Sequence, residues 1–125
     1  MKVVLVEDER IQRTLYSKIL NNYEVVEFTS AEEALPSILT TPYDCGVFDL
    51  NLPGMSGAEL LREIRKTGNR IPVALITAYA SIITGLVSGK DAEQIFLAAG
   101  FDIYFEKSVR PSLLIDFVEQ TRTIN

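Results

Sequence analysis

Acidic, hydroxyl and ammonium side chains stand directly after four of the short apolar runs in this 125-residue sequence. Glu7 and Asp8 follow the first run, Asp49 a later one, Thr77 the next, and Lys107 the last. Carboxylate oxygens without histidine or cysteine ligands suit a hard cation such as Mg²⁺. A carboxylate nucleophile with a metal, a hydroxyl and a lysine beside it can receive a phosphoryl group. We expect this chemistry at Asp49 if the fold brings these residues together.

The residues around Asp49 make its carboxylate a candidate site. The apolar run at 44–48 is typical of a buried strand, and Asp49 stands where that strand should end. The Pro-Gly pair at 53–54 favours a turn, and Ser56 with Glu59 has the spacing of a helix capping box. Asp49 alone could simply cap that turn, since aspartate is common there. The polar residues at the other strand ends favour the functional interpretation.

The elements that must position these side chains alternate along the chain. Apolar runs predict strands that begin near residues 2, 23, 44, 72 and 102. Helical stretches alternate with these strands, which predicts an α/β fold with a doubly wound, five-stranded parallel sheet of the flavodoxin-like type. In the strand order 2-1-3-4-5, the carboxyl ends share one edge, where ligands bind. No linker or repeat interrupts the pattern, so residues 1–125 are expected to form a single domain.

Three helical stretches carry specific expectations. Ile11, Leu15 and Ile19 share one apolar face of the first helix, as in a helix that packs on a core. Pro36 lies inside the second helix and should kink or shorten it. The fourth connection is longer than the others, and we expect either an elongated fourth helix or one that is broken near Gly89.

The composition excludes several classes of function. The net charge of −5 argues against direct binding to nucleic acid or to acidic membranes. No apolar run approaches the length of a membrane span. The sequence has no histidine, which excludes histidine-based zinc sites and Ser-His or Cys-His catalysis. Cys45 is the only cysteine and cannot form an internal disulfide, which fits a cytoplasmic location.

The sequence resembles the receiver domain of bacterial two-component response regulators from Lys2 to about Thr121. The most specific matches are Val-Glu-Asp-Glu at 6–9, Asp-Leu-Asn-Leu-Pro-Gly-Met-Ser-Gly at 49–57, Ile-Thr-Ala-Tyr at 76–79 and Tyr-Phe-Glu-Lys at 104–107. The resemblance implies a phosphorylation-dependent signalling switch, not an enzyme in the usual sense. Such a domain assists its own phosphorylation and dephosphorylation.

The resemblance also implies a role for each residue of the metal site. Asp49 is the phosphoacceptor by this comparison. Asp8 and Asp49, with the backbone carbonyl of Asn51, would hold Mg²⁺. Glu7 would act mostly through water.

Phosphoryl contacts, switching and partners are likewise implied by the resemblance. Thr77 and Lys107 would contact the phosphoryl group, and Tyr104 would move inward with Thr77 on activation. The phosphodonor would be a separate histidine kinase or histidine phosphotransfer protein, consistent with a chain that lacks histidine. The face between the fourth and fifth helices is where the family forms homodimers and meets its output partners. The sequence does not identify the output partner.

Two departures from the family pattern qualify the resemblance. Ser108 stands where the family usually has a proline in a cis peptide, so we expect a trans bond there. The spacing from Thr77 to Lys107 is longer than usual, and the excess falls in the fourth helix. The altered helix leaves open a pseudo-receiver, an interaction module that keeps the fold and is not switched by phosphate.

Two further alternatives explain the sequence less well. A flavin-binding protein would need a phosphate-binding loop after the first strand, where the acids at 7–9 would repel phosphate. A phosphatase of the haloacid-dehalogenase type needs a second aspartate two residues after the nucleophile. Asn51 occupies that position here.

Overall fold

The computed structural model describes residues 1–77, 100–107 and 109–123. The predicted fourth helix, elongated or broken near Gly89, lies outside the described residues, and so does the bond at Ser108. None of the described helices is long and apolar enough to cross a membrane.

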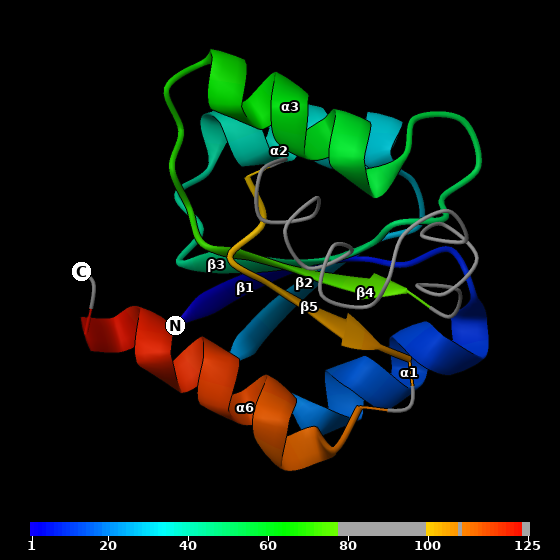
Figure 1. The fold of residues 1–125 in the computed structure, drawn as a ribbon, viewed down its shortest axis with the longest axis vertical. Coiled ribbons are helices and arrows are strands. Elements are labelled where there is room, and N and C mark those ends of the chain that lie inside the picture. The colour runs from blue at the N-terminus through cyan, green and yellow to red at the C-terminus, as the bar shows by residue number, and fades with distance from the viewer. Residues whose placement is uncertain (78–99, 108, 124–125) are drawn as a thin grey trace, which may run out of the picture.

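Five parallel strands form one sheet in the order β2-β1-β3-β4-β5, which confirms the predicted topology (Figure 1). The strands are β1 (Lys2–Val6), β2 (Glu24–Phe28), β3 (Cys45–Asp49), β4 (Val73–Thr77) and β5 (Ile103–Glu106). The register pairs Val6 with Phe48 and Asp49 with Ile76, so the carboxyl ends of β1, β3 and β4 lie level. The central strand β3 is buried along its whole length.

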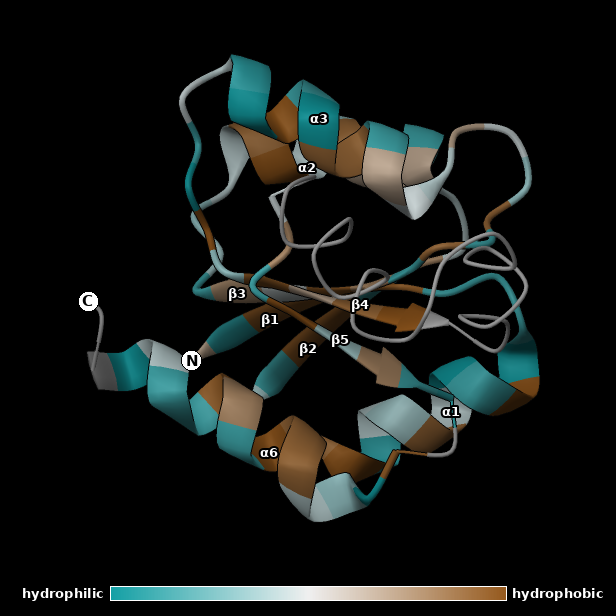
Figure 2. Cartoon of the chain, viewed as in Figure 1, coloured by the Kyte–Doolittle hydropathy of each residue, from teal (hydrophilic) through white to brown (hydrophobic). Residues whose placement is uncertain are grey.

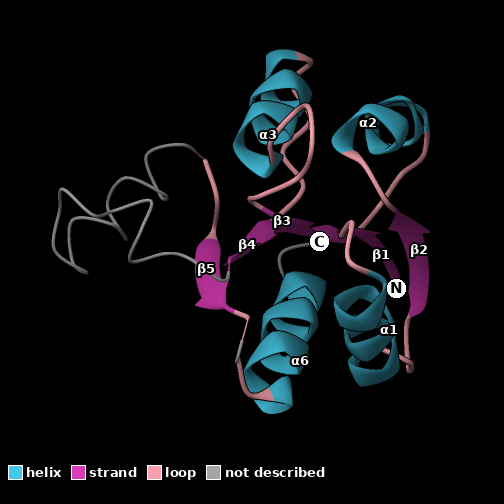
Figure 3. Ribbon diagram, turned by 90° about the vertical axis from the view of Figure 1, so that its right-hand side faces the viewer, coloured by secondary structure: helices cyan, strands magenta, loops and turns pink. Residues whose placement is uncertain are grey.

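Helices cover both faces of the sheet (Figure 3). The helices are α1 (Arg10–Ile19), α2 (Ala31–Thr40), α3 (Gly57–Lys66) and α6 (Pro111–Gln120), followed by a 3₁₀ turn at Thr121–Thr123. Helices α2 and α3 lie on one face, and α1 and α6 lie on the other. Alternate residues of each strand point to opposite faces, so Val4 and Val6 join one core while Val3 and Leu5 join the other. In Figure 2 the hydrophobic side of α3 faces the sheet and its hydrophilic side faces away from it.

The helix ends follow the local signals of the sequence. Ser30 Oγ accepts a hydrogen bond from Glu33 N at 3.2 Å, and Ser56 Oγ accepts one from Glu59 N at 3.1 Å. Ser56 is therefore the predicted N-cap, and Ser30 caps α2 in the same way. Gly68 follows α3 with a positive φ of 87°, as expected for a residue that ends a helix in the left-handed conformation.

The prediction for Pro36 is wrong in one respect. Helix α2 continues through Pro36 to Thr40, so the proline does not shorten it. The residues before and after the proline keep the helix packed on the sheet, since Ala31, Ala34 and Ile38 are all buried. Tertiary packing therefore outweighs the local cost of the proline.

The buried face of α1 differs from the expected one. Ile11 is 81% exposed and Leu15 is 45% exposed, whereas Tyr16 and Leu20 are buried and Ile19 is half-buried. Tyr16 and Leu20 have the same four-residue spacing but lie one position further along, about 100° around the helix axis. Burying the large aromatic ring against β1 and β3 removes more apolar area from water than burying Ile11 would. The expectation that Ile11 and Leu15 pack on the core was wrong.

Candidate functional site

Asp49 is a buried carboxylate at the carboxyl end of the central strand. It is 2% exposed, and its backbone lies between β1 and β4 in the middle of the sheet. Its Oδ1 accepts a hydrogen bond from Asn51 N at 3.0 Å. Burying a carboxylate is costly unless it gains partners, so its surroundings must supply further positive charge.

Lys107 supplies that charge. It directly follows β5, the strand at one edge of the described sheet. Its Nζ lies 3.2 Å from Asp49 Oδ2 and 3.0 Å from Glu7 Oε1. Burial disfavours the ammonium, but its interactions with Glu7 and Asp49 outweigh this effect and raise the pKa of Lys107. A third acid, Glu9, lies 3.6 Å away through its Oε1. The sequence predicts Lys107 at this edge, but its contact with Glu9 was not predicted.

Glu7 is the most deeply buried acid of the site. It is 1% exposed, and its Oε2 has no hydrogen-bond partner among the described residues. Burial, followed by the neighbouring Asp49 carboxylate, raises the pKa of Glu7 to about 8, although Lys107 opposes the shift. Two buried carboxylates thus share one ammonium, and Glu7 Oε2 is left without a partner among the described residues.

The residues fit a divalent metal ion. Glu7, Asp8 and Asp49 each offer a carboxylate oxygen, and these oxygens all lie within 4.8 Å of one another. Asp8 is exposed while the other two acids are buried, so the cluster opens to solvent at Asp8. An all-oxygen donor set with an unpartnered buried carboxylate oxygen suits Mg²⁺.

Arg13 holds the backbone that carries these acids. Its Nη1 donates to the carbonyl oxygen of Glu7 at 3.0 Å and to that of Asp8 at 3.3 Å. Its Nε lies 3.6 Å from Glu27 Oε1. The guanidinium therefore joins the loop after β1 to the neighbouring strand β2. The sequence does not predict this contact, because the acceptors of Nη1 are backbone carbonyls that no side-chain pattern reveals.

The loop after Asp49 is tied down at several points. Leu50 N donates to Ile76 O at 3.1 Å, and Gly57 N donates to Leu50 O at 3.1 Å. A Cβ at Gly57 would collide with the carbonyl oxygen of Asp49, so glycine permits α3 to begin against the site. Asn51, whose carbonyl was expected to bind metal, lies exposed in this loop.

The remaining predicted site residues lie on the two neighbouring strands. Thr77 is the last residue of β4 and pairs with Glu106 of β5, but its side chain lies outside the described part of the structure. Tyr104 is half-buried on β5 and packs against the core beneath α2 and α3. The structure therefore brings together the side chains of Glu7, Asp8, Asp49 and Lys107. Tyr104 lies on β5, three residues before Lys107.

Tyr16 is a buried residue near the site that the sequence pattern did not predict. Its phenol is buried, has no hydrogen-bond partner among the described residues, and lies within the electrostatic influence of Glu7. Burial first, and then the charge of Glu7, raise the pKa of Tyr16 to about 12. The sequence does not single out this buried position, because Tyr16 and Leu20 have the same four-residue spacing as Ile11 and Leu15.

Curated proteins with similar sequences are response regulators. The chain is 40% identical over 96 residues to the two-component response regulator PhoP of Pseudomonas aeruginosa, covering 73% of this chain and 43% of that protein. It is 35% identical over 103 residues to the response regulator protein FleR of the same species, covering 81% and 22%. The chain thus spans less than half the length of either relative.

Solved receiver domains have the same fold. A Francisella response regulator receiver domain superposes with a TM-score of 0.83 at 26% identity, covering 98% of this chain and 96% of that one. The receiver domain of a sensor histidine kinase from Pseudomonas aeruginosa, solved with magnesium coordinated in its active site cleft, gives 0.81 at 26% identity, covering 95% and 94%. The sequence also matches the response regulator receiver domain family over residues 3–119. The chain belongs to this family.

Proposed function

We propose that Asp49 accepts a phosphoryl group from the phosphohistidine of a histidine kinase or a histidine phosphotransfer protein. The observation that carries this proposal is the buried Asp49 carboxylate, 3.2 Å from Lys107 Nζ and clustered with Glu7 and Asp8. The carboxylate attacks phosphorus, a P–O bond forms, and the P–N bond to the donor breaks. The electron pair returns to the imidazole nitrogen, which takes a proton from solvent.

The acids of the site would hold the metal that this transfer needs. Asp8 and Asp49, with the carbonyl of Asn51, would bind Mg²⁺ directly, and Glu7 would bind through water. The ion would neutralise the charge of the incoming phosphoryl oxygens. Asn51 N already orients Asp49 Oδ1, at 3.0 Å, so the nucleophile is positioned before the donor arrives.

Lys107 and Thr77 would then contact the phosphoryl group. In the described conformation the ammonium forms ion pairs with Glu7 and Asp49. Phosphorylation would draw it onto the new anion, and that differential contact is what shifts the population of conformations. Movement of Thr77 toward the phosphoryl group and of Tyr104 inward would carry the signal to an output partner. We further propose that the same site assists the hydrolysis that resets the switch.

The exposed face of α1 supports the assignment of a protein phosphodonor. A shallow groove lined by Arg10, Ile11, Thr14, Leu15 and Lys18 lies on this helix. The helix begins directly after Glu9, which lies 3.6 Å from Lys107. A donor that docked its own apolar face here would bring its histidine to the site. Such a kinase partner, together with the buried Cys45 thiol, is consistent with a cytoplasmic location.

Intact mass spectrometry tests the proposed function directly. Incubation with acetyl phosphate and Mg²⁺ should add one phosphoryl group to the protein, and Asp49→Asn or a chelator should abolish the gain. Asp44→Asn is the matched control, because Asp44 directly precedes the opposite end of β3 and should not change the result. If the wild-type mass stays unchanged while Mg²⁺ binds, the chain is a pseudo-receiver.

A further inference from the structure

Glu9 makes a contact across the site that its position at the start of a helix does not require. It directly precedes α1, and its backbone carbonyl oxygen accepts a hydrogen bond from Arg13 N at 2.9 Å. Its side chain makes no capping hydrogen bond to the helix, and its Oε1 lies 3.6 Å from Lys107 Nζ. The helix therefore fixes the backbone of Glu9, while its carboxylate contacts a residue that follows β5.

The three acids around Lys107 differ in burial and in distance. Lys107 Nζ donates hydrogen bonds to Glu7 at 3.0 Å and to Asp49 at 3.2 Å, and both of these acids are buried. Glu9 lies beyond hydrogen-bond distance from the ammonium, and its side chain is 62% exposed. An ammonium has three N–H donors, so one remains after the two hydrogen bonds. Glu9 is the third acid within reach of the ammonium and the weakest of its three contacts.

A phosphoryl group that arrives at Asp49 must displace a contact of the ammonium to bind it. Releasing Glu7 would leave a buried carboxylate without its ion pair, which is costly. Releasing Glu9 costs little, because water solvates its exposed carboxylate and exposed ion pairs are weak. Glu9 is therefore the contact that the phosphoryl group replaces. Until it is replaced, its carboxylate competes with the phosphoryl oxygens for the ammonium.

The charge of Glu9 also acts on an approaching phosphodonor. Glu9 is not a member of the described carboxylate cluster that fits a metal ion, which is formed by Glu7, Asp8 and Asp49. A bound cation would offset the charges of that cluster, whereas the exposed carboxylate of Glu9 would still repel an anion. A donor protein that docks on α1 gains contact energy that offsets this repulsion. A small free anion gains none.

We propose that Glu9 is a specificity-determining residue that hinders small dianionic phosphodonors, such as acyl phosphates, and so favours transfer from a docked protein. The inference rests on the proposed phosphorylation of Asp49. Glu9 takes no part in the transfer itself. The P–O bond to Asp49 forms as the P–O bond to the acyl oxygen breaks, and the acyl carboxylate leaves with the bonding electron pair. The carboxylate of Glu9 slows the binding of the donor that precedes this step.

Intact mass spectrometry with two small donors of different charge tests this proposal. At neutral pH acetyl phosphate is a dianion, whereas phosphoramidate carries one negative charge less because its nitrogen is protonated. At saturating Mg²⁺, Glu9→Gln should raise the rate of phosphorylation by acetyl phosphate by about threefold, the effect of one exposed ion pair. The rate with phosphoramidate should change much less. Added salt should reduce the difference between Glu9→Gln and the wild type, because an exposed charge is screened.

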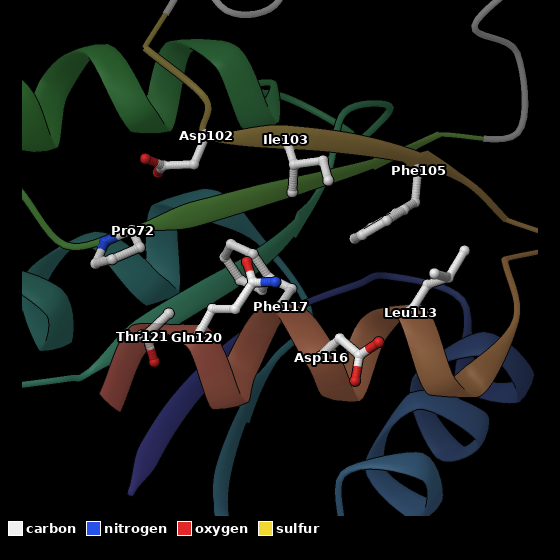
Figure 4. Close-up of a pocket in the computed structure, with 9 residues that line it drawn as sticks. All are labelled: Pro72, Asp102, Ile103, Phe105, Leu113, Asp116, Phe117, Gln120 and Thr121. Atoms are coloured by element: carbon white, nitrogen blue, oxygen red, sulfur yellow. The ribbon is translucent and has the colours of Figure 1, made fainter. Parts of the chain in front are cut away.

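Two matched variants separate the contact with Lys107 from the loss of one negative charge. Glu106→Gln changes an exposed glutamate that directly precedes Lys107 in the sequence. Asp116→Asn changes an exposed acid on α6, in the groove between that helix and β5 (Figure 4). Neither acid forms an ion pair with Lys107, whose acidic partners among the described residues are Glu7, Glu9 and Asp49. Both variants should keep the wild-type rate with acetyl phosphate.

The outcomes separate this inference from the proposed function. If the wild type is phosphorylated and Glu9→Gln is not faster with acetyl phosphate, Glu9 has no such role although Asp49 accepts phosphate. The same holds if the two control variants accelerate the reaction as much as Glu9→Gln does. Equal acceleration with both donors would also overturn the inference, because Glu9 would then not discriminate between them. If neither the wild type nor Glu9→Gln gains a phosphoryl group, the proposed function and this inference are both wrong.

Discussion

The carboxylate of Glu32 occupies the space that a side chain at Gly54 would need. A Cβ built at Gly54 would collide with Glu32 Oε2, and Gly54 has a positive φ of 76°. The same Oε2 accepts a hydrogen bond from Met55 N at 3.0 Å, which also lowers the pKa of Glu32. Helix α2 thereby holds the loop that follows Asp49 and contains Asn51.

This contact predicts a coupled effect of two substitutions. Gly54→Ala should lower the free energy of unfolding by about 1 kcal/mol or more, because alanine is strained at positive φ. Glu32→Ala should recover part of that loss by removing the collision, and the double-mutant cycle in urea measures the coupling. The control pair is Gly54→Ala with Glu63→Ala, since Glu63 contacts Lys66 and not this loop. If both double variants lose the same free energy of unfolding, Glu32 and Gly54 are not coupled.

Mg²⁺ binding should depend more on Asp8 than on Glu7. Asp8 is the exposed acid of the cluster and would bind the ion directly, whereas Glu7 is buried and would act through water. Asp8→Ala should therefore weaken Mg²⁺ by more than about tenfold and slow phosphorylation with it, since a charged ligand is lost. Isothermal titration of each variant with Mg²⁺ measures the difference. A larger loss from Glu7→Ala would refute Asp8 as the direct ligand.

Glu7 should make stability depend on pH when Mg²⁺ is absent. Its pKa rises from an ordinary value of 4.5 to about 8 on folding, so the folded protein holds a proton that the unfolded chain releases between these values. This contribution is fully present below pH 4.5 and is lost as the pH rises through about 8. The free energy of unfolding in a chelator should therefore fall across this window.

Two measurements test whether Glu7 causes this pH dependence of the free energy of unfolding. Glu7→Gln should flatten the profile, because glutamine does not titrate. Saturating Mg²⁺ should also flatten it, since the ion favours the ionised carboxylate and binds only the folded state. A profile in Glu7→Gln that falls as steeply as the wild type would assign the dependence to another group.

Lys107→Ala should separate metal binding from switching. Removing the ammonium takes a positive charge from beside Glu7 and Asp49, so Mg²⁺ should bind at least as tightly as in the wild type. Phosphorylation should no longer produce the full structural change, because the group that bridges to the phosphoryl oxygens is absent. NMR spectra with and without beryllofluoride measure the response, with Lys66→Ala as an exposed control. A wild-type response from Lys107→Ala would overturn this role.

Removing the side-chain hydroxyl should have different effects on stability at Tyr16 and at Tyr43, which pack on opposite faces of the sheet. The buried Tyr16 hydroxyl has no described partner, so Tyr16→Phe should leave stability unchanged or raise it by about 1 kcal/mol. The Tyr43 hydroxyl lies 2.7 Å from Ser37 Oγ, so Tyr43→Phe should lower stability by about 1 kcal/mol. Chemical denaturation measures both. A clear loss in Tyr16→Phe would mean that its hydroxyl is hydrogen-bonded in solution.

Much of the fold and of the site is predictable because its signals are local. Strand ends follow from short apolar runs, and the helix starts at Ser30 and Ser56 follow from capping residues three positions before a glutamate. Parallel strands in one sheet place their carboxyl ends together, so the acids and Lys107 were expected at the same edge. The sequence has no histidine and one cysteine, so the predicted metal had to be one that prefers oxygen ligands.

Only the tertiary structure decided which of several compatible arrangements forms. The stripe of Ile11 and Leu15 and the stripe of Tyr16 and Leu20 have the same spacing on α1, and packing against the sheet selected the second. The reach of Lys107 across the sheet to Glu7 also depends on strand register and side-chain direction, which local sequence does not specify. Such contacts join residues far apart in the chain, and their energies exist only once the whole sheet has formed.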